Sequence, residues 1–311
     1  MAAPTNTLQT YQTKGIREDL EDVIYRIAPT ETPFLSAIAK GKAASTFHEW
    51  QTQDLATAAN NAQIEGDDAT AAAATPTARI GNYTQISSKT VVVSGTQQAV
   101  NTAGRDDELA YQVSLRGLEL KRDMEVALTQ NTTFNVGAAG TARQTRGLEG
   151  WIATNNDMGA GGAAPNIGTN TAATDGTARA FTETQLKNIL QLAWAQGGKV
   201  DMLMMGGTQK QTFSTFTGGS TRYDVSEDKK VTASVDVYIS DFGTITAKPN
   251  RFQRSRTVFA LQTDMWGIAT LRPMQTTPLA KTGDSDRRQL LVEYTLVSRQ
   301  EKGSGAIRDV L

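Results

Sequence analysis

Side chains able to carry out chemistry are scarce in this chain of 311 residues. It holds one histidine, His48, and no cysteine, which excludes thiolate catalysis, disulfides and zinc–thiolate sites. Because a Ser-His-Asp triad or a multi-histidine metal site would depend on His48 alone, neither is expected. His48 lies beside Trp50 in a segment with strand character, where we expect a structural histidine.

Motifs for phosphate binding and acid–base catalysis are also missing. The GGK string at residues 197–199 lacks the preceding spacing of a Walker A loop and the Ser or Thr after its lysine. The glycine pairs do not form the dinucleotide-binding fingerprint. Asp284 and Asp286 adjoin Arg287 and Arg288, which indicates a solvated turn rather than a pair of catalytic acids. We therefore expect no enzyme activity and no cofactor.

The overall charge narrows the range of partners. A formal net charge of −1 gives no global excess of positive charge that would attract nucleic acid or anionic lipid. No apolar run approaches the roughly 18 residues that a membrane helix needs, and the N-terminus lacks the apolar core of a signal peptide. We expect no membrane partner, and a protein that is made and used in a cytoplasm or released from one.

Arg251, Arg254 and Arg256 form the densest basic patch. A charged edge strand would explain it, and so would a contact for an acidic neighbour or for nucleic acid. A sequence-specific DNA reader would also need a recognition helix and a larger positive face.

One long amphipathic helix is predicted over about residues 105–131. Apolar residues recur at helical spacing along one face. They are Leu109, Val113, Leu120, Met124, Ala127 and Leu128. At 1.5 Å per residue the helix would be about 40 Å long, about twice the ~20 Å radius of gyration of a compact domain of this length. This length predicts a spine for separate lobes.

Charges along the predicted helix agree with its direction. Asp106, Asp107 and Glu108 place negative charge at the N-terminus, where the helix dipole favours it. Lys121 and Glu125 are four residues apart and are expected to pair weakly on the outer face.

An extended arm and two short helices are predicted before residue 45. The first fourteen residues are polar and rich in Thr, which indicates an arm. An apolar face predicts a helix over residues 16–27. Thr32 followed by Pro33 predicts the start of a second helix running through Ile38, and Gly41 is expected to close it.

A long hairpin with a loose tip is predicted next. Residues 46–55 have strand character, and 80–94 form a longer returning strand. At ~3.3 Å per residue, an arm of about fifteen residues reaches roughly 50 Å. The tip, residues 56–77, has no periodic apolar face, so it cannot bury itself alone. Such an arm needs a partner that covers its edges; a disordered insertion is the alternative interpretation.

A second lobe is predicted from about residue 150, after flexible glycine-rich connections at 137–140 and 159–162. Thr182 and Gln185 form a capping box for a helix that stops at Gly197. The apolar run at 200–205 predicts a buried central strand. Further elements are a helix at 208–216 and strands at 231–240, 243–248, 257–271 and 289–299, of which the last two should rejoin the spine. This mixed order indicates an α+β protein with two lobes.

Several short strings resemble the major capsid proteins of tailed bacteriophages, which have the Hong Kong 97-like capsid fold. They are ETPF at residues 31–34 with HEW at 48–50, VDVYISDFG at 235–243, LRP at 271–273 and LAKTGD at 279–284. The resemblance runs over nearly the whole chain, and the order of arm, hairpin, spine helix and inserted lobe is its stronger part.

The resemblance implies an α+β fold with four parts. They are an N-terminal arm at 1–44, an extended β-hairpin loop at 45–95, an axial domain at 150–250, and a peripheral domain from 96–149 and 251–311 with the spine helix at 105–131. Some members cross-link a lysine of the loop to a neighbouring asparagine, but no lysine occurs here between Lys42 and Lys89. With the first predicted helix at residue 16, there is no room for the long N-terminal scaffolding segment of other members.

The resemblance also implies a structural function without catalysis. Copies of the chain would self-assemble into hexamers and pentamers of an icosahedral head around double-stranded DNA, in the host cytoplasm and then in the virion. Further partners would be portal, scaffolding or decoration proteins, with DNA contacted non-specifically. A head-completion or tail protein that forms rings or tubes, an enzyme, and a monomeric binding module are the alternatives.

Within such a shell we expect the acidic cluster at the hairpin tip to meet a basic patch on an adjacent subunit. The predicted inter-subunit contacts are Glu65, Asp67 and Asp68 on one side and Arg251, Arg254 and Arg256 on the other.

Overall fold

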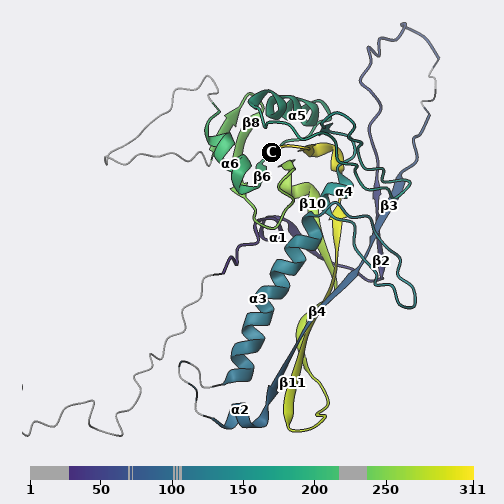
Figure 1. The fold of residues 1–311 in the computed structure, drawn as a ribbon. Helices are drawn as coiled ribbons and strands as arrows, with labels where there is room; N and C mark the ends of the chain where they lie inside the picture. The colour runs from purple at the N-terminus through teal and green to yellow at the C-terminus, as the bar shows by residue number, and fades with distance from the viewer. Residues whose placement is uncertain are drawn as a thin grey trace, which may run out of the picture.

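The computed structural model contains two lobes and a projecting hairpin (Figure 1). It describes residues 28–68, 71, 73–100, 102, 104, 107–216 and 237–311. An elongated lobe holds a long helix and a four-stranded sheet, and a rounder lobe is built on a six-stranded sheet. This mixture confirms the predicted α+β class. The arm and the helix predicted over residues 1–27 lie outside the described residues.

The predicted spine helix is α3 (Glu108–Thr129), which has 22 residues. Asp107 fixes its start, because the Asp107 side chain accepts hydrogen bonds from the N–H groups of Leu109 and Ala110. Gln130 is extended, with φ −72° and ψ 161°, so the helix ends before residue 131. Residues 105 and 106 are outside the described part of the chain.

The elongated lobe packs α3 against a four-stranded sheet in the order β1-β10-β11-β4. Its strands are β1 (Ala39–Lys42), β10 (Trp266–Pro278), β11 (Ser285–Ser298) and β4 (Gln85–Ser94). Alternate residues of a strand point to one face, and Leu290 and Val292 of β11 pack with Leu120 and Met124 of α3. The strand predicted at 289–299 therefore rejoins the spine helix as expected.

Helix α1 (Pro33–Ala37) begins after Thr32, as predicted, but it ends early. The prediction that Gly41 closes this helix is wrong, because Gly41 lies inside β1 opposite Ala269. The backbone is already extended at Ile38, with ψ 156°. Parallel pairing with β10 outweighs the local helical pattern, as tertiary context commonly does.

The projecting hairpin consists of β2 (Phe47–Thr52) and β3 (Ala78–Tyr83), which are antiparallel. The prediction of a single returning strand over residues 80–94 is wrong, because the chain turns at Thr84 and continues as β4 in the four-stranded sheet. Thr84 is fully buried at this corner. Its N–H donates to the Thr46 carbonyl at 2.8 Å, and its hydroxyl donates to Glu293 Oε1 at 2.8 Å.

The second lobe is built on a six-stranded sheet in the order β5-β12-β9-β6-β8-β7. The strands are β5 (Asn156–Asp157), β12 (Gly305–Ile307), β9 (Val258–Leu261), β6 (Met202–Met205), β8 (Gly243–Pro249) and β7 (Val237–Ser240). All four residues of β6 are buried, and the strand is interior, which confirms the predicted central strand. Residues 231–236 of another predicted strand lie outside the described part.

The strand predicted at 257–271 is in fact two strands, one in each sheet. Its first part is β9 in the six-stranded sheet, and after the 3-10 helix η2 (Thr263–Met265) the chain enters β10. Strand β12, close to the C-terminus, also joins the six-stranded sheet. Strand β10 joins the sheet that packs on the spine helix, and Phe259 and Leu261 of β9 pack into the same core as α3 from the six-stranded sheet.

Two helices cover one face of the six-stranded sheet, α5 (Glu183–Ala195) and α6 (Gly207–Ser214). The predicted capping box is confirmed, since Thr182 and Gln185 each accept a hydrogen bond from the other's backbone N–H. On the other face, Met202 and Met204 of β6 pack into the same core as α3. One continuous core thus joins the two lobes.

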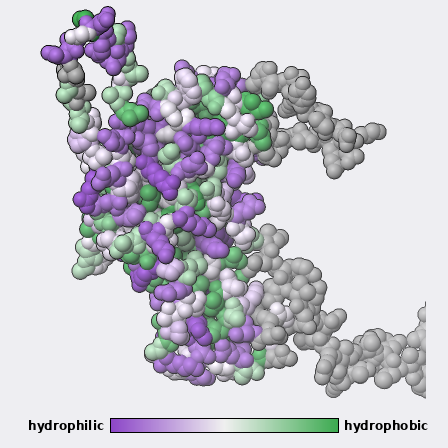
Figure 2. All heavy atoms as spheres, turned by 180° about the vertical axis from the view of Figure 1, so that it is seen from behind, coloured by the Kyte–Doolittle hydropathy of each residue, from purple (hydrophilic) through white to green (hydrophobic). Residues whose placement is uncertain are grey.

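Three short helices complete the described fold, and the outer surface is largely polar. They are α2 (Gly95–Ala99), α4 (Leu148–Trp151) and the 3-10 helix η3 (Glu301–Gly303). Within the described ranges, none of the helices has the length and apolar character needed to cross a bilayer. The far end of the projecting loop carries mainly hydrophilic residues (Figure 2).

Candidate assembly surfaces

The loop between β2 and β3 extends away from both lobes. It is tied down at its base, where Asp54 accepts hydrogen bonds from Gln300 at 3.0 Å and from Lys302. The hydrogen bond and the charge of Lys302 lower the pKa of Asp54. Beyond the base the chain is exposed, with Leu55 96% and Ile64 78% accessible. The loop therefore gains little from contacts with its own chain.

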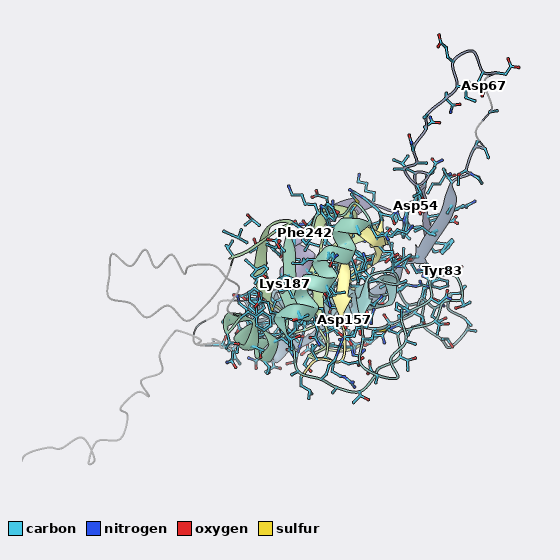
Figure 3. All side chains as sticks on the ribbon, turned by 90° about the horizontal axis from the view of Figure 1, so that it is seen from above. Asp54, Asp67, Tyr83, Asp157, Lys187 and Phe242 are labelled. Carbon is cyan, nitrogen blue, oxygen red and sulfur yellow. The ribbon has the colours of Figure 1, made fainter. Side chains whose placement is uncertain are left out.

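The acidic cluster lies at the far end of this loop, where Figure 3 labels Asp67. Glu65, Asp67 and Asp68 are all exposed. Gly66 supplies the turn between them with φ +84°, and the Asp68 N–H donates to Asp67 Oδ1 at 2.9 Å. Within the described residues, no cation pairs with any of these three carboxylates.

The three arginines of the basic patch differ from one another. Arg251 is exposed. Arg254 is half-buried and donates to Glu149 Oε1 at 3.0 Å and also to Asp175. Arg256 donates to Asp309 Oδ1 at 2.9 Å and to the Gly176 carbonyl at 2.7 Å. Two of the three are thus paired with acids of their own chain, and the chain does not bring them to the hairpin tip.

A buried charge centre lies behind these arginines and joins three parts of the chain. Glu149 of α4 is 1% exposed, and its Oε1 accepts from Arg308 at 2.9 Å, from Arg254 and from the Thr257 hydroxyl at 3.1 Å. Burial raises the pKa of Glu149, although the charges of Arg308 and Arg254 oppose the shift. Sequence reasoning missed this centre because its members are far apart in the chain.

The glycine-rich connection at 159–162 packs closely around Asp309 together with Gly176, contrary to the flexibility predicted for it. Asp309 accepts from the N–H groups of Gly159 at 3.1 Å and Gly176 at 2.9 Å. A Cβ at Gly159 would lie 2.1 Å from the Thr177 carbonyl oxygen, and one at Gly176 would lie 2.6 Å from the Gly159 oxygen. Glycine is needed here for close backbone approach.

Glu125 anchors the N-terminal segment to the spine helix. The prediction that it pairs with Lys121 on the outer face is wrong, since Glu125 is 0% exposed. Its two oxygens accept from the N–H groups of Phe34 at 2.9 Å and Leu35 at 2.8 Å, and Oε1 also accepts from Asn250 at 2.7 Å. Burial raises the pKa of Glu125 despite these hydrogen bonds.

Glu293 fixes the corner from which the hairpin leaves. It accepts from the Thr84 hydroxyl, from Arg272 Nε at 2.7 Å and from Arg143. Burial alone would raise the pKa of Glu293, but hydrogen bonds from Thr84 and Arg272 and the charges of Arg143 and Arg272 bring it below the usual value. The direction of the hairpin is therefore set by β11 of the elongated lobe.

A catalytic arrangement does not emerge from the described residues. His48 is half-buried and packs on Trp50, with ring centroids 5.9 Å apart. Over the described ranges, no group of His, Asp and Glu side chains could hold a metal ion. The charged clusters around Glu149 and Glu293 are ion pairs that join distant segments of the chain, whereas the acids at the hairpin tip are exposed.

Comparisons with known proteins agree with this arrangement. A curated relative, the major capsid protein of Escherichia phage Phieco32, is 26% identical over 346 residues, covering 99% of this chain and 97% of the relative. The capsid asymmetric unit of cyanophage A-1(L) has a similar fold, with a TM-score of 0.64 at 13% identity over 97% of this chain and 98% of that one. The capsid of a native GTA particle gives the same TM-score at 10% identity, over 97% and 98% of the two chains.

These similarities to solved capsid chains confirm the predicted Hong Kong 97-like capsid fold. The family model described as SU10 major capsid protein matches residues 3–311, nearly the whole chain. The chain belongs to the SU10 major capsid protein family.

Proposed function

We propose that copies of this chain form hexamers and pentamers that close into an icosahedral head around double-stranded DNA. Heterologous contacts repeated between identical subunits generate rings, and rings of slightly different curvature close a shell. The chain acts by binding its own copies and not by catalysis. Assembly in the host cytoplasm and a place in the finished virion follow from this role.

The observation that carries the proposal is the projecting loop between β2 and β3. Its residues leave the body of the subunit, are exposed, and carry three acids without a cation partner among the described residues. A segment that buries so little surface of its own is stabilised when a partner covers it, and the ordering entropy is offset on assembly.

The two sheets suggest a division into domains that differs from simple sequence blocks. We assign the extended loop to β2, β3 and the residues between them, because β4 pairs with β11. The peripheral domain comprises α3 with strands β4, β10 and β11 of the four-stranded sheet, whose remaining strand, β1, belongs to the arm. The axial domain comprises the six-stranded sheet with α5 and α6, and therefore includes β9 and β12 from the C-terminal quarter. The arm stays assigned to residues 1–44.

The contact of the tip acids with a basic patch on a neighbour stays part of the proposal. Arg251 is the most available of the three arginines, because it is exposed while Arg254 and Arg256 already bind acids of their own chain. The carboxylates of a neighbouring subunit would pair with the positive charge that Arg251 presents. Binding of packaged DNA would be non-specific and weak, in keeping with the net charge of −1.

Electron microscopy of the purified full-length chain tests the proposal. Closed shells of uniform curvature, alone or after addition of a scaffolding or portal protein from the same virus, are the expected result. Open tubes or single rings would instead support a tail or head-completion role. A chain that stays monomeric in sizing chromatography under all these conditions would contradict self-assembly.

A further inference from the structure

Strand β7 forms one edge of the six-stranded sheet. Among the residues that the structure describes, it pairs with β8 alone, with Val237 opposite Thr246 and Ile239 opposite Thr244. Tyr238 and Ile245 point to the face covered by α5 and α6. Val237 and Ile239 point the other way and are 53% and 77% exposed. The core beneath the opposite face reaches β6 but not β8 or β7.

Two aromatic side chains lie near the same end of the sheet, on α5 and in the turn after β7. Trp194, near the end of α5, is 59% exposed and packs against Phe242, with ring centroids 5.4 Å apart. Phe242 lies in the turn that joins β7 to β8 and is 36% exposed. A Glu183–Lys187 ion pair of 2.9 Å lies on the same helix. We call Trp194, Val237, Ile239 and Phe242 the edge patch.

The edge patch lacks the features that protect a free sheet edge. Val237–Ser240 contains no charged residue and no proline, and natural edges without these features pair with other chains unless they are covered. An exposed tryptophan with apolar neighbours and a polar rim is also the usual composition of an interface centre. The patch therefore requires a partner with an apolar surface.

The arrangement of the molecule indicates which partner this is. In Figure 1 the hairpin of β2 and β3 leaves on one side of the rounder lobe and β8 is on the other side, where β7 adjoins it in the sheet order. Two copies placed side by side in the same orientation therefore present different surfaces to each other, as in a ring. Figure 3 likewise shows Phe242 and Lys187 away from the loop that carries Asp67.

We propose that the edge patch docks against a second copy of this chain when subunits assemble. This inference rests on the proposed self-assembly and names one surface that carries it. Trp194 and Phe242 anchor the contact on the side of α5, and Val237 and Ile239 supply an apolar strip on the other face of β7. Burial of the patch removes both the exposed apolar area and the unprotected strand edge from water.

The first test is substitution of Ile239 by lysine in the full chain. Ile239→Lys places a charge in the apolar strip, so we expect the concentration needed for assembly to rise at least about tenfold, as for loss of an interface anchor. Val136→Lys is the matched control, because Val136 is 59% exposed outside the patch and should leave assembly unchanged. Light scattering gives the assembly threshold, and circular dichroism of the unassembled chain checks folding.

The second test uses Trp194 as a reporter and does not depend on a disruptive variant. Trp151 and Trp266 are 0% exposed, Trp50 is half-buried and Trp194 is 59% exposed. Acrylamide should quench Trp194 in unassembled chains and much less in assembled ones, and the difference should disappear in Trp194→Phe.

Three outcomes separate this inference from the proposed function. If the native chain forms shells and Ile239→Lys forms them at the same concentration, the inference is overturned and self-assembly stands. The inference also fails if Trp194 stays accessible in shells, or if it is already shielded in the unassembled chain by another segment. Absence of any assembly by the native chain would overturn the proposed function itself.

Discussion

The hairpin tip and the centre around Glu149 are both clusters of charge, but their surroundings differ. Glu65, Asp67 and Asp68 are exposed to water and have no cation partner among the described residues. Glu149 is 1% exposed and is held by Arg308 and Arg254. Removing an exposed acid changes the free energy of unfolding little. Removing one partner of a buried ion pair lowers it strongly, because the other charge stays buried without a counter-charge. The tip therefore contributes little to the stability of the subunit, whereas the centre around Glu149 joins segments of its fold.

The largest expected effect comes from breaking the buried centre. Glu149→Ala leaves the buried Arg308 without its carboxylate and removes one of the two acids that Arg254 binds, so we expect a loss of about 3–5 kcal/mol in the free energy of unfolding. Urea unfolding of the unassembled chain measures it. Glu119→Ala is the control, because Glu119 pairs with Arg116 at the surface and should cost less than about 1 kcal/mol. Equal losses would show that the two environments do not differ as described.

The next effect is expected at Glu125. Glu125→Ala leaves the N–H groups of Phe34 and Leu35 and the Asn250 amide without their acceptor, at a cost of about 2–4 kcal/mol. Glu125→Gln keeps one oxygen and should lose less. Limited proteolysis near residues 34–42 should also become faster in the alanine variant. Unchanged cleavage would mean that Glu125 does not hold the arm.

The raised pKa of Glu125 gives this prediction a pH dependence of known sign. Because the pKa is higher in the folded chain than the usual 4.5, the folded state binds the proton more tightly. The stabilisation that comes from protonating Glu125 in the folded chain is fully present below pH 4.5. It is lost as the pH rises through the raised pKa of Glu125. Glu125→Gln should remove this part of the pH dependence in urea unfolding measured from acid to neutral pH. An identical pH profile in both proteins would contradict the burial of the charge.

A smaller effect is expected at Gly176, whose backbone binds Asp309 and Arg256 at the edge of the same centre. A Cβ there would lie 2.6 Å from the Gly159 oxygen, so Gly176→Ala should destabilise the chain by about 2 kcal/mol. Gly207→Ala is the control, because nothing lies within 4 Å of a Cβ at that position. Thermal unfolding distinguishes the two, and equal melting temperatures would argue against close packing.

The smallest effect on stability is expected at the hairpin tip. Reversing Glu65, Asp67 and Asp68 to lysine should change the free energy of unfolding by no more than about 0.5 kcal/mol, because the tip makes few contacts. Assembly should nevertheless be impaired, since the proposed partner on the neighbour is basic. Sedimentation of assembled particles tests this, and normal shells from the triple variant would remove the tip contact from the proposal.

Local sequence patterns were sufficient to predict those elements whose hydrogen bonds and packing involve residues close together in the chain. The capping box of Thr182 and Gln185, the apolar run of β6 and the apolar face of α3 all depend on residues within a few positions of each other. Hydrogen bonds and side-chain periodicity at this range are nearly the same in any fold. These elements were predicted with nearly correct bounds.

Tertiary structure alone decided the places where distant segments compete for the same residues. Glu125 has the spacing of a surface residue, yet the N–H groups of α1 and the Asn250 amide bury it. Likewise, nothing local divides residues 80–94 at Thr84, where Glu293 and Thr46 hold the corner.

The sequence by itself determined helices α3, α5 and α6, the central strand and, through the order of its short strings, the resemblance to the capsid fold. Only the tertiary structure decided which charges are buried in ion pairs and which are exposed to water. The physical reason is that the energy of a charge depends on the water and counter-charges around it, and segments more than a hundred residues apart supply both.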